Sequence, residues 1–128
     1  FKFFMMCEIP SNVILLDKFI DVGIDGISIG SNDLTMLILG TDRDNETVAS
    51  VYDERNPAVL WALEQIIKTA HKRNILVSIC GQAPSVHSDL TEKLIQWGIT
   101  SVSVSPDAVD RTRELVYQVE KRNLHGKN

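Results

Sequence analysis

Short apolar runs alternate along this chain with longer segments of mixed hydrophobic and polar residues. Four of the runs have the length of β-strands, and they cover residues 2–7, 26–30, 75–79 and 101–104. The last two are rich in β-branched residues and bounded by turn-forming ones, which is typical of buried parallel strands. Each run leads directly into polar or reactive side chains. The pattern therefore predicts a functional site where the strands end.

A segment with helical character follows each of the four runs. In the longest, a stripe of apolar residues recurs at every third or fourth position: Val59, Leu60, Leu63, Ile66, Ile67 and Ala70. Asn56-Pro57 is a typical start for this helix. Other helices are expected from Pro10 to Gly23, over 32–39 and 88–97, and from Ser105 onward with Val109, Val116 and Val119 facing inward. Alternating strands and helices predict an α/β fold with a parallel sheet.

Four βα units are too few to close a (β/α)8 barrel, which typically needs ~250 residues. With 128 residues, the chain is expected to be either the C-terminal half of such a barrel or a small open α/β sheet. Because it starts with Phe1 at the edge of a strand, we expect a piece of a larger protein. Residues 1–122 form the predicted domain and 123–128 a polar tail. The acidic loop 41–56 is long enough to suggest a functional role.

Composition and charge narrow the possible functions. The chain is 44% hydrophobic and 23% charged, which is ordinary for a globular domain, and its net charge of −4 gives no reason to expect nucleic acid. No apolar run approaches the ~20 residues that span a bilayer. Cys7 and Cys80 end the first and third strands, which should lie about 9–10 Å apart and therefore beyond disulfide reach. Reduced thiols and a cytoplasmic protein are expected.

Two carboxylates occupy equivalent places in successive βα units. Glu8 follows the first strand and Asp33 follows the second, so both should project from the same edge of the sheet. Two hard oxygen ligands that leave coordination positions open suit Mg²⁺. The alternative for each residue is a solvated charge at the end of a strand.

The turn formed by Gly30, Ser31, Asn32 and Asp33 offers free backbone amides at a helix N-terminus. Such amides suit a carboxylate or phosphate, although a simple N-cap by Ser31 or Asn32 is the alternative. Arg43, in the long loop, is either an anion clamp or a surface ion-pair partner.

Cys80 differs from Cys7 because a glycine follows it where the chain leaves the sheet. Its thiol is a candidate acid, base or nucleophile, whereas Cys7 is expected to be a small buried hydrophobe. An inert Cys80 is the alternative. No catalytic role is expected for His71, His87 or His125, and the two tryptophans, Trp61 and Trp97, are expected to be core or interface anchors.

The order and spacing of these residues resemble the C-terminal barrel of the phosphoenolpyruvate synthase (pyruvate, water dikinase) family. The motifs are MMCEIPSN (5–12), SIGSNDLT (28–35), DRD (42–44), DERN (53–56) and ICGQAPS (79–85), and the resemblance extends over residues 3–122. Pyruvate phosphate dikinase and enzyme I of the sugar phosphotransferase system are less similar. In those relatives an acidic residue commonly follows the Cys-Gly pair, where this chain has Gln82.

The resemblance implies a set of roles for the strand-end residues. Glu8 and Asp33 hold Mg²⁺, and Cys80 donates and accepts the proton at the substrate methyl carbon. Pyruvate or phosphoenolpyruvate contacts the turn and the loop through Gly30, Ser31, Asn32, Asp33 and Arg43. Met36 stands where family members commonly have Gln, which leaves these roles untouched.

The resemblance also implies partners outside this chain. A phosphohistidine domain and an ATP-binding domain of the same full-length protein supply the phosphoryl group, so the fragment alone is expected to be inactive. Family barrels typically dimerise through this region, so a homo-oligomer is expected. A non-catalytic half-barrel that serves oligomerisation is the alternative from another class.

Overall fold

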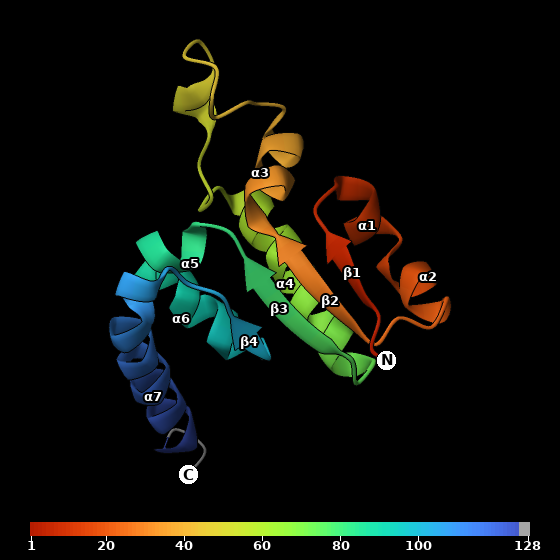
Figure 1. Ribbon diagram of the computed structural model, residues 1–128, viewed down its shortest axis with the longest axis vertical. Coiled ribbons are helices and arrows are strands. Elements are labelled where there is room, and N and C mark those ends of the chain that lie inside the picture. Colours follow the sequence, from red (N-terminus) through yellow and green to blue (C-terminus); the bar gives the residue numbers. More distant parts are fainter. Residues whose placement is uncertain (126–128) are drawn as a thin grey trace.

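The computed structural model describes residues 1–125 of the chain. Within them, four parallel strands form one sheet in sequence order: β1 (Phe4–Cys7), β2 (Gly26–Gly30), β3 (Leu76–Cys80) and β4 (Ser101–Val102) (Figure 1). Sequential parallel order with helical crossovers is the arrangement of consecutive strands in a βα barrel. The predicted α/β fold with four βα units is therefore confirmed, although β4 is half as long as its apolar run.

Helices follow each strand in the order that the sequence predicts. They are α1 (Pro10–Ile14), α2 (Leu16–Asp21), α3 (Ser31–Leu39), α4 (Pro57–Lys72), α5 (Ala83–Val86), α6 (Ser88–Trp97) and α7 (Val109–His125), with 3-10 turns at η1 (Ala49–Val51) and η2 (Pro106–Ala108). The Asn56 side chain caps α4 by accepting a 2.9 Å hydrogen bond from the Ala58 N–H. Gly98, in a left-handed conformation, ends α6.

The structure corrects three details of the helical prediction. The single helix expected between Pro10 and Gly23 is broken at Leu15, where φ is −110° and ψ is 25°, so that α1 ends before α2 begins. Val109 does not face inward, because it is 39% exposed. Trp61 is 58% exposed, so it is not a core residue.

The expected polar tail is helical where the structure describes it. Helix α7 continues to His125, past the predicted boundary at 122. The rest of the predicted tail, residues 126–128, lies outside the described residues. No helix within 1–125 has both the length and the hydropathy needed to cross a membrane.

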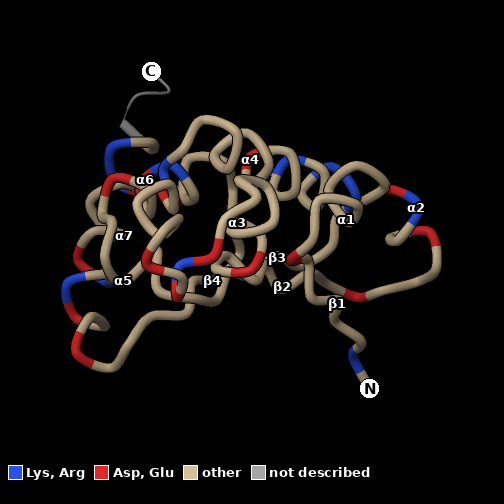
Figure 2. The backbone as a smooth tube through the Cα atoms, turned by 90° about the horizontal axis from the view of Figure 1, so that it is seen from above, with Lys and Arg blue, Asp and Glu red and all other residues tan. Residues whose placement is uncertain are grey.

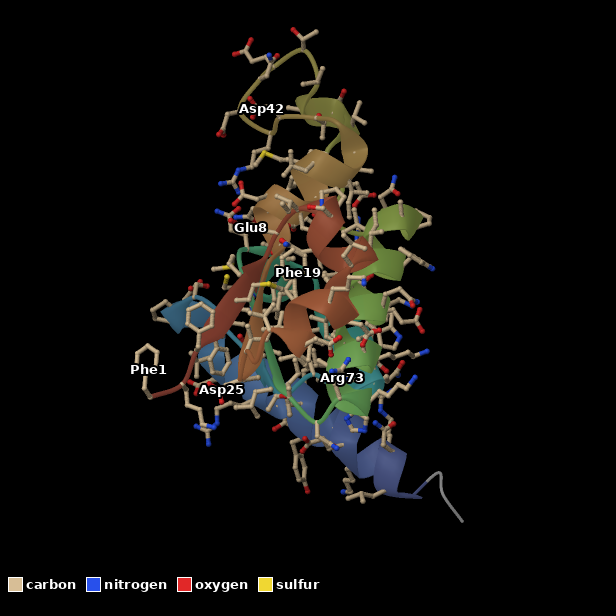
Figure 3. All side chains as sticks on the ribbon, turned by 90° about the vertical axis from the view of Figure 1, so that its right-hand side faces the viewer. Phe1, Glu8, Phe19, Asp25, Asp42 and Arg73 are labelled. Carbon is tan, nitrogen blue, oxygen red and sulfur yellow. The ribbon has the colours of Figure 1, made fainter. Side chains whose placement is uncertain are left out.

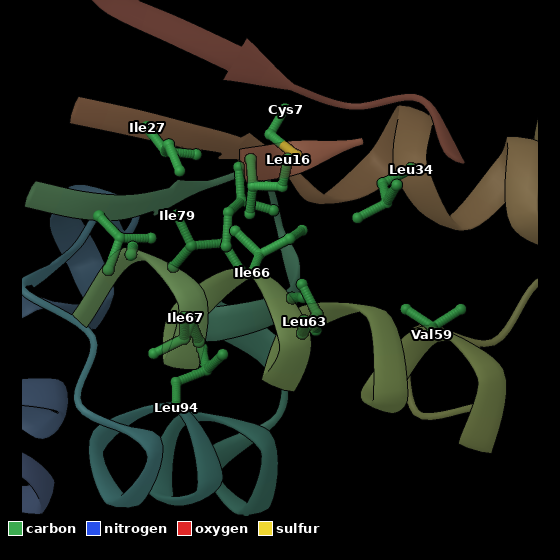
Figure 4. Close-up of a cluster of buried hydrophobic side chains, with 14 of the residues drawn as sticks. Cys7, Leu16, Ile27, Leu34, Val59, Leu63, Ile66, Ile67, Ile79 and Leu94 are labelled. Atoms are coloured by element: carbon green, nitrogen blue, oxygen red, sulfur yellow. The ribbon is translucent and has the colours of Figure 1, made fainter. Parts of the chain in front are cut away.

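The hydrophobic core lies between one face of the sheet and α4 (Figure 4). On the strands, Cys7 pairs with Ile29, and Ile29 with Ile79, so three fully buried side chains line up across the sheet. Leu63, Ile66 and Ile67 of α4 are also buried and belong to the same core cluster. The apolar stripe predicted for this helix is its core-facing side, and Cys7 is the buried hydrophobe that the sequence predicts.

The opposite face of the sheet remains largely exposed. Side chains alternate between the two faces of a strand, so the neighbours of the core residues point away from α4. Among them, Phe4 is 41%, Met6 45% and Leu76 48% exposed. In a closed barrel this face would line the interior.

Candidate active site at the carboxyl ends of the strands

Three positions on neighbouring strands lie side by side at the carboxyl end of the sheet. Cys7 pairs with Ile29, which puts the next residue, Glu8, level with Gly30, and Gly30 in turn pairs with Cys80. Paired residues share one face of the sheet, and this face is the one opposite the core. The pairing therefore brings together two of the residues singled out by the sequence, Glu8 and Cys80, with a glycine between them.

Gly30 is required here because the Glu8 side chain lies across it. A Cβ atom at position 30 would lie 2.7 Å from Glu8 Oε2 and 2.8 Å from Glu8 Cβ, closer than such atoms approach. The missing side chain thus makes room for the carboxylate. Figure 3 shows Glu8 at the end of the sheet nearest Asp42 of the long loop, and Asp25 at the opposite end.

Asn12 fixes the turn that carries Glu8. Its side-chain oxygen accepts hydrogen bonds from the backbone N–H groups of Glu8, at 3.3 Å, and Ile9, at 3.4 Å. Asn12 is buried, so these bonds are shielded from water. Nothing in the sequence distinguishes Asn12, because a polar residue in the first turn of a helix is ordinary.

The Cys80 thiol is partly buried and surrounded by polar atoms. Its sulfur lies 3.4 Å from the Ile29 carbonyl oxygen, and the Ser28 hydroxyl donates to it at 3.8 Å. Cys7 differs in every respect: it is fully buried, and burial together with the nearby Glu8 carboxylate raises its pKa to about 12. Cys7 therefore stays protonated and inert, whereas Cys80 is only partly buried and lies on the uncovered face of the sheet.

Ser31 joins the two turns that follow β2 and β3. Its buried hydroxyl donates a 2.9 Å hydrogen bond to the Cys80 carbonyl oxygen. Gly81 permits this approach, since a Cβ atom there would collide with Ser31 Oγ, and its φ of 121° is itself rare for other residues. Helix α3 has Gly30 at its N-cap and no side-chain cap, so the simple capping role considered for Ser31 or Asn32 is wrong.

Asn32 and Arg43 meet beside a buried carboxylate from the long loop. The Asn32 amide fits its surroundings with its nitrogen 3.2 Å from Glu54 Oε1 and its oxygen 3.0 Å from Arg43 Nη1. Glu54 is only 6% exposed. This residue was not predicted from the sequence: the acid lies within the DERN motif, but nothing in a polar loop indicates that one of its carboxylates is buried.

Asp33 lies in the first turn of α3 and is exposed to solvent. It therefore belongs to the same end of the sheet as Glu8 and Cys80. Figure 2 looks onto this end, and acidic segments appear beside the labels of α3 and β3 with a basic segment among them. No group of three or more His, Cys, Asp or Glu side chains placed to hold a metal ion occurs in the described part of the chain.

Four parallel strands in sequence order with helical crossovers are the arrangement of half a βα barrel, and carboxylates, a thiol and an uncapped helix N-terminus gather where these strands end. The family described as PEP-utilising enzyme, PEP-binding domain, matches residues 1–121. The chain belongs to this family.

Curated proteins similar to this chain include several named phosphoenolpyruvate synthase. It is 53% identical over 124 residues to the probable phosphoenolpyruvate synthase of Staphylothermus marinus and 52% identical over 124 residues to the phosphoenolpyruvate synthase of Aeropyrum pernix. It is 49% identical over 120 residues to the phosphoenolpyruvate synthase of Helicobacter pylori. These matches cover 94–95% of this chain but only 15% of each relative. The chain thus spans a small part of the proteins that it resembles.

Proposed function

We propose that this chain is the pyruvate- and phosphoenolpyruvate-binding portion of a phosphoenolpyruvate synthase. The full-length enzyme would make phosphoenolpyruvate, AMP and phosphate from pyruvate, ATP and water through a phosphohistidine. The observation that carries the proposal is the alignment of Glu8, Gly30 and Cys80 at one level of the sheet, in a chain about half identical to proteins of that name.

Cys80 is the proposed acid and base at carbon three of the substrate. In the direction of phosphoenolpyruvate synthesis the thiolate takes a proton from the pyruvate methyl group, so a C–H bond breaks and an S–H bond forms. The electron pair moves to the carbonyl oxygen, which then accepts the phosphoryl group from the phosphohistidine. In the reverse direction the thiol returns the proton to carbon three.

The substrate anion is held by groups from the turn and the loop. The uncapped first turn of α3, from Gly30 to Asp33, presents backbone N–H groups that favour a carboxylate or phosphate. Ser31 and Asn32 shape this turn, and the Arg43 guanidinium adds a positive charge with fixed donor geometry. Together these groups orient pyruvate with its methyl carbon toward the thiol.

Glu8 and Asp33 are the proposed ligands of Mg²⁺. Their side chains have no hydrogen bond or ion pair among residues 1–125, so both carboxylates are available to a cation. Two such carboxylates at one edge suit a hard divalent cation that retains sites for water and substrate. When bound, the ion would stabilise the negative charge that develops on the pyruvate oxygens.

The remaining parts of the enzyme are proposed to lie in the rest of the full-length chain. Residues 1–122 would be the C-terminal part of the barrel domain, with 123–128 as a tail. The preceding half of the barrel would cover the bare sheet face, and separate phosphohistidine and ATP-binding domains would deliver the phosphoryl group. We further propose a cytoplasmic homo-oligomer that needs neither nucleic acid nor membrane.

The products formed from ATP test the proposal. The full-length protein containing this chain, supplied with pyruvate, ATP and Mg²⁺, should release phosphoenolpyruvate, AMP and inorganic phosphate in equal amounts, as measured by chromatography and a phosphate assay. Chelation of Mg²⁺ should stop the reaction. Pyrophosphate as a product, with a requirement for added phosphate, would instead indicate a pyruvate phosphate dikinase, and no turnover of pyruvate would contradict the proposal.

A further inference from the structure

Glu54 stands out because it is a carboxylate that is buried although it comes from an exposed loop. It is 6% exposed, whereas Asp53, its neighbour in the sequence, has a side chain 53% exposed. Burial of a carboxylate is unfavourable unless hydrogen-bond donors surround it. The donors around the Glu54 carboxylate therefore show which segments of the chain it holds together.

Three side chains from three segments surround the Glu54 carboxylate. The Tyr52 hydroxyl donates a 3.0 Å hydrogen bond to Oε1, and the Asn32 amide nitrogen lies 3.2 Å from the same oxygen. His87 Nε2, from the turn between α5 and α6, lies 3.6 Å from Oε2. One carboxylate therefore ties the long loop to the turn that follows β2 and to the turn between α5 and α6.

Glu54 determines which way the Asn32 amide points. A carboxylate only accepts hydrogen bonds, so the amide nitrogen turns toward it and the amide oxygen faces the Arg43 guanidinium, 3.0 Å away. The opposite orientation would place oxygen against carboxylate and nitrogen against guanidinium. That opposite orientation would gain only a 3.5 Å hydrogen bond from the Gln82 N–H to the Asn32 oxygen. The orientation with the amide nitrogen toward Glu54 is therefore favoured.

Tyr52 supports the same arrangement as a permanent donor. Burial, and then the nearby Glu54 carboxylate, raise the pKa of Tyr52 to about 12. Its hydroxyl therefore keeps its proton across the physiological pH range and continues to donate to Glu54. The carboxylate is held from the loop side and can act on Asn32 from a fixed position.

We propose that Glu54 is a positioning residue, which orients the Asn32 amide and, through its oxygen, fixes the Arg43 guanidinium for the substrate anion. This inference rests on the proposed function, because it assumes that Arg43 binds pyruvate. Glu54 itself does not touch the substrate. Its removal should weaken pyruvate binding without affecting steps that occur in other domains.

The test compares Glu54→Gln with Asp53→Asn in the full-length protein. Both variants lose one negative charge at adjacent positions, but Asp53 is exposed and its side chain pairs only with Arg55 within the described residues. Glu54→Gln should raise the KM for pyruvate roughly tenfold, as expected for the loss of one orienting hydrogen bond. Autophosphorylation by ATP, which measures folding of the rest of the enzyme, should be unchanged. Asp53→Asn should match the wild type in both assays.

A double-mutant cycle with Arg43→Ala separates positioning from general stability. If Glu54 acts through Arg43, then Glu54→Gln should change the KM by less than about twofold once Arg43 is absent. A full additional tenfold effect would overturn the inference, and so would equal KM values for Glu54→Gln and Asp53→Asn. A wild-type protein that does not turn over pyruvate would overturn the proposed function instead.

Tyr52→Phe provides a second variant should Glu54→Gln fail to fold. It removes one donor from the carboxylate and preserves its charge, so the KM for pyruvate should rise by a smaller factor, about twofold to fourfold. A KM identical to that of the wild type would overturn the inference.

Discussion

Two cysteines end strands of the same sheet and have opposite environments. Cys7 points into the core, where burial raises its pKa to about 12. Cys80 points to the uncovered face, next to the Ser28 hydroxyl and level with Gly30. The alternation of side chains along a strand separates the two thiols, and of the two only Cys80 lies on the uncovered face, where we propose that the substrate binds.

Replacement of Cys80 by Ala in the full-length protein should abolish exchange of the pyruvate methyl proton with solvent, since no other thiol reaches the ligand face of the described chain. NMR of pyruvate in deuterium oxide measures this exchange. Autophosphorylation by ATP should persist, because the phosphoryl group arrives from another domain.

Cys7→Ala is the matched control. It should retain exchange and lower the stability of the protein by only about 1 kcal/mol, through the small cavity left in the core. Equal loss of exchange in both variants would mean that the cysteines matter for folding, and would remove Cys80 from the mechanism.

At the scale of the elements, the turn after β3 is the most constrained connection near the site. Gly81 has a positive φ and also lies against the Ser31 hydroxyl, which bonds to the Cys80 carbonyl. Gly98, which ends α6, has a positive φ of 96°, but a Cβ atom added there would meet only the His71 ring, at ordinary contact distances of 3.5 Å and 3.9 Å. Both glycines have a positive φ, but only Gly81 is also closely packed. Comparing substitutions at the two positions therefore separates the cost of the backbone conformation from the cost of the close contact.

Gly98→Ala should cost about 1 kcal/mol, the penalty for an alanine with positive φ. Gly81→Ala should cost clearly more, because the new Cβ forces Ser31 and the turn after β2 to move. Thermal denaturation of the full-length protein measures the stability, and the KM for pyruvate reports on the turn. Equal effects of the two substitutions on both quantities would show that the contact with Ser31 does not constrain the site.

For the whole molecule, the exposed sheet face and the two outer strands are unusual in a protein that stands alone. Within the described residues, β1 and β4 each pair with a strand on one side only, and the bare face exposes Phe4, Met6 and Leu76. Unpaired edges and apolar faces promote association. In the proposed enzyme the first half of the barrel would cover them.

The isolated chain should therefore self-associate, or else leave its site loops disordered. Light scattering measures the first outcome and hydrogen exchange the second. A double substitution of Met6 and Leu76 by Lys should reduce association, whereas Lys at Val22 and Leu124, which are 82% and 75% exposed and lie in or beside helices, should leave it unchanged. A compact wild-type monomer with ordered loops would contradict the prediction.

The sequence by itself determined the order of strands and helices, the α/β class and the end of the sheet at which the candidate site lies. These follow from periodicity and from the chain order of βα units, which are local properties. The inert character of Cys7 was also predictable, since the residues around it alternate in and out of the core.

Only the tertiary structure decided which polar groups meet. The burial of Glu54, the orientation of the Asn32 amide and the role of Gly81 depend on contacts between segments far apart in the chain, and no local pattern encodes them. The break at Leu15 was not predictable either, because the helical pattern of the sequence continues through it. A carboxylate in a polar loop can either face solvent or be buried among hydrogen-bond donors. Packing in the folded molecule decides between the two, and the local sequence does not encode that packing.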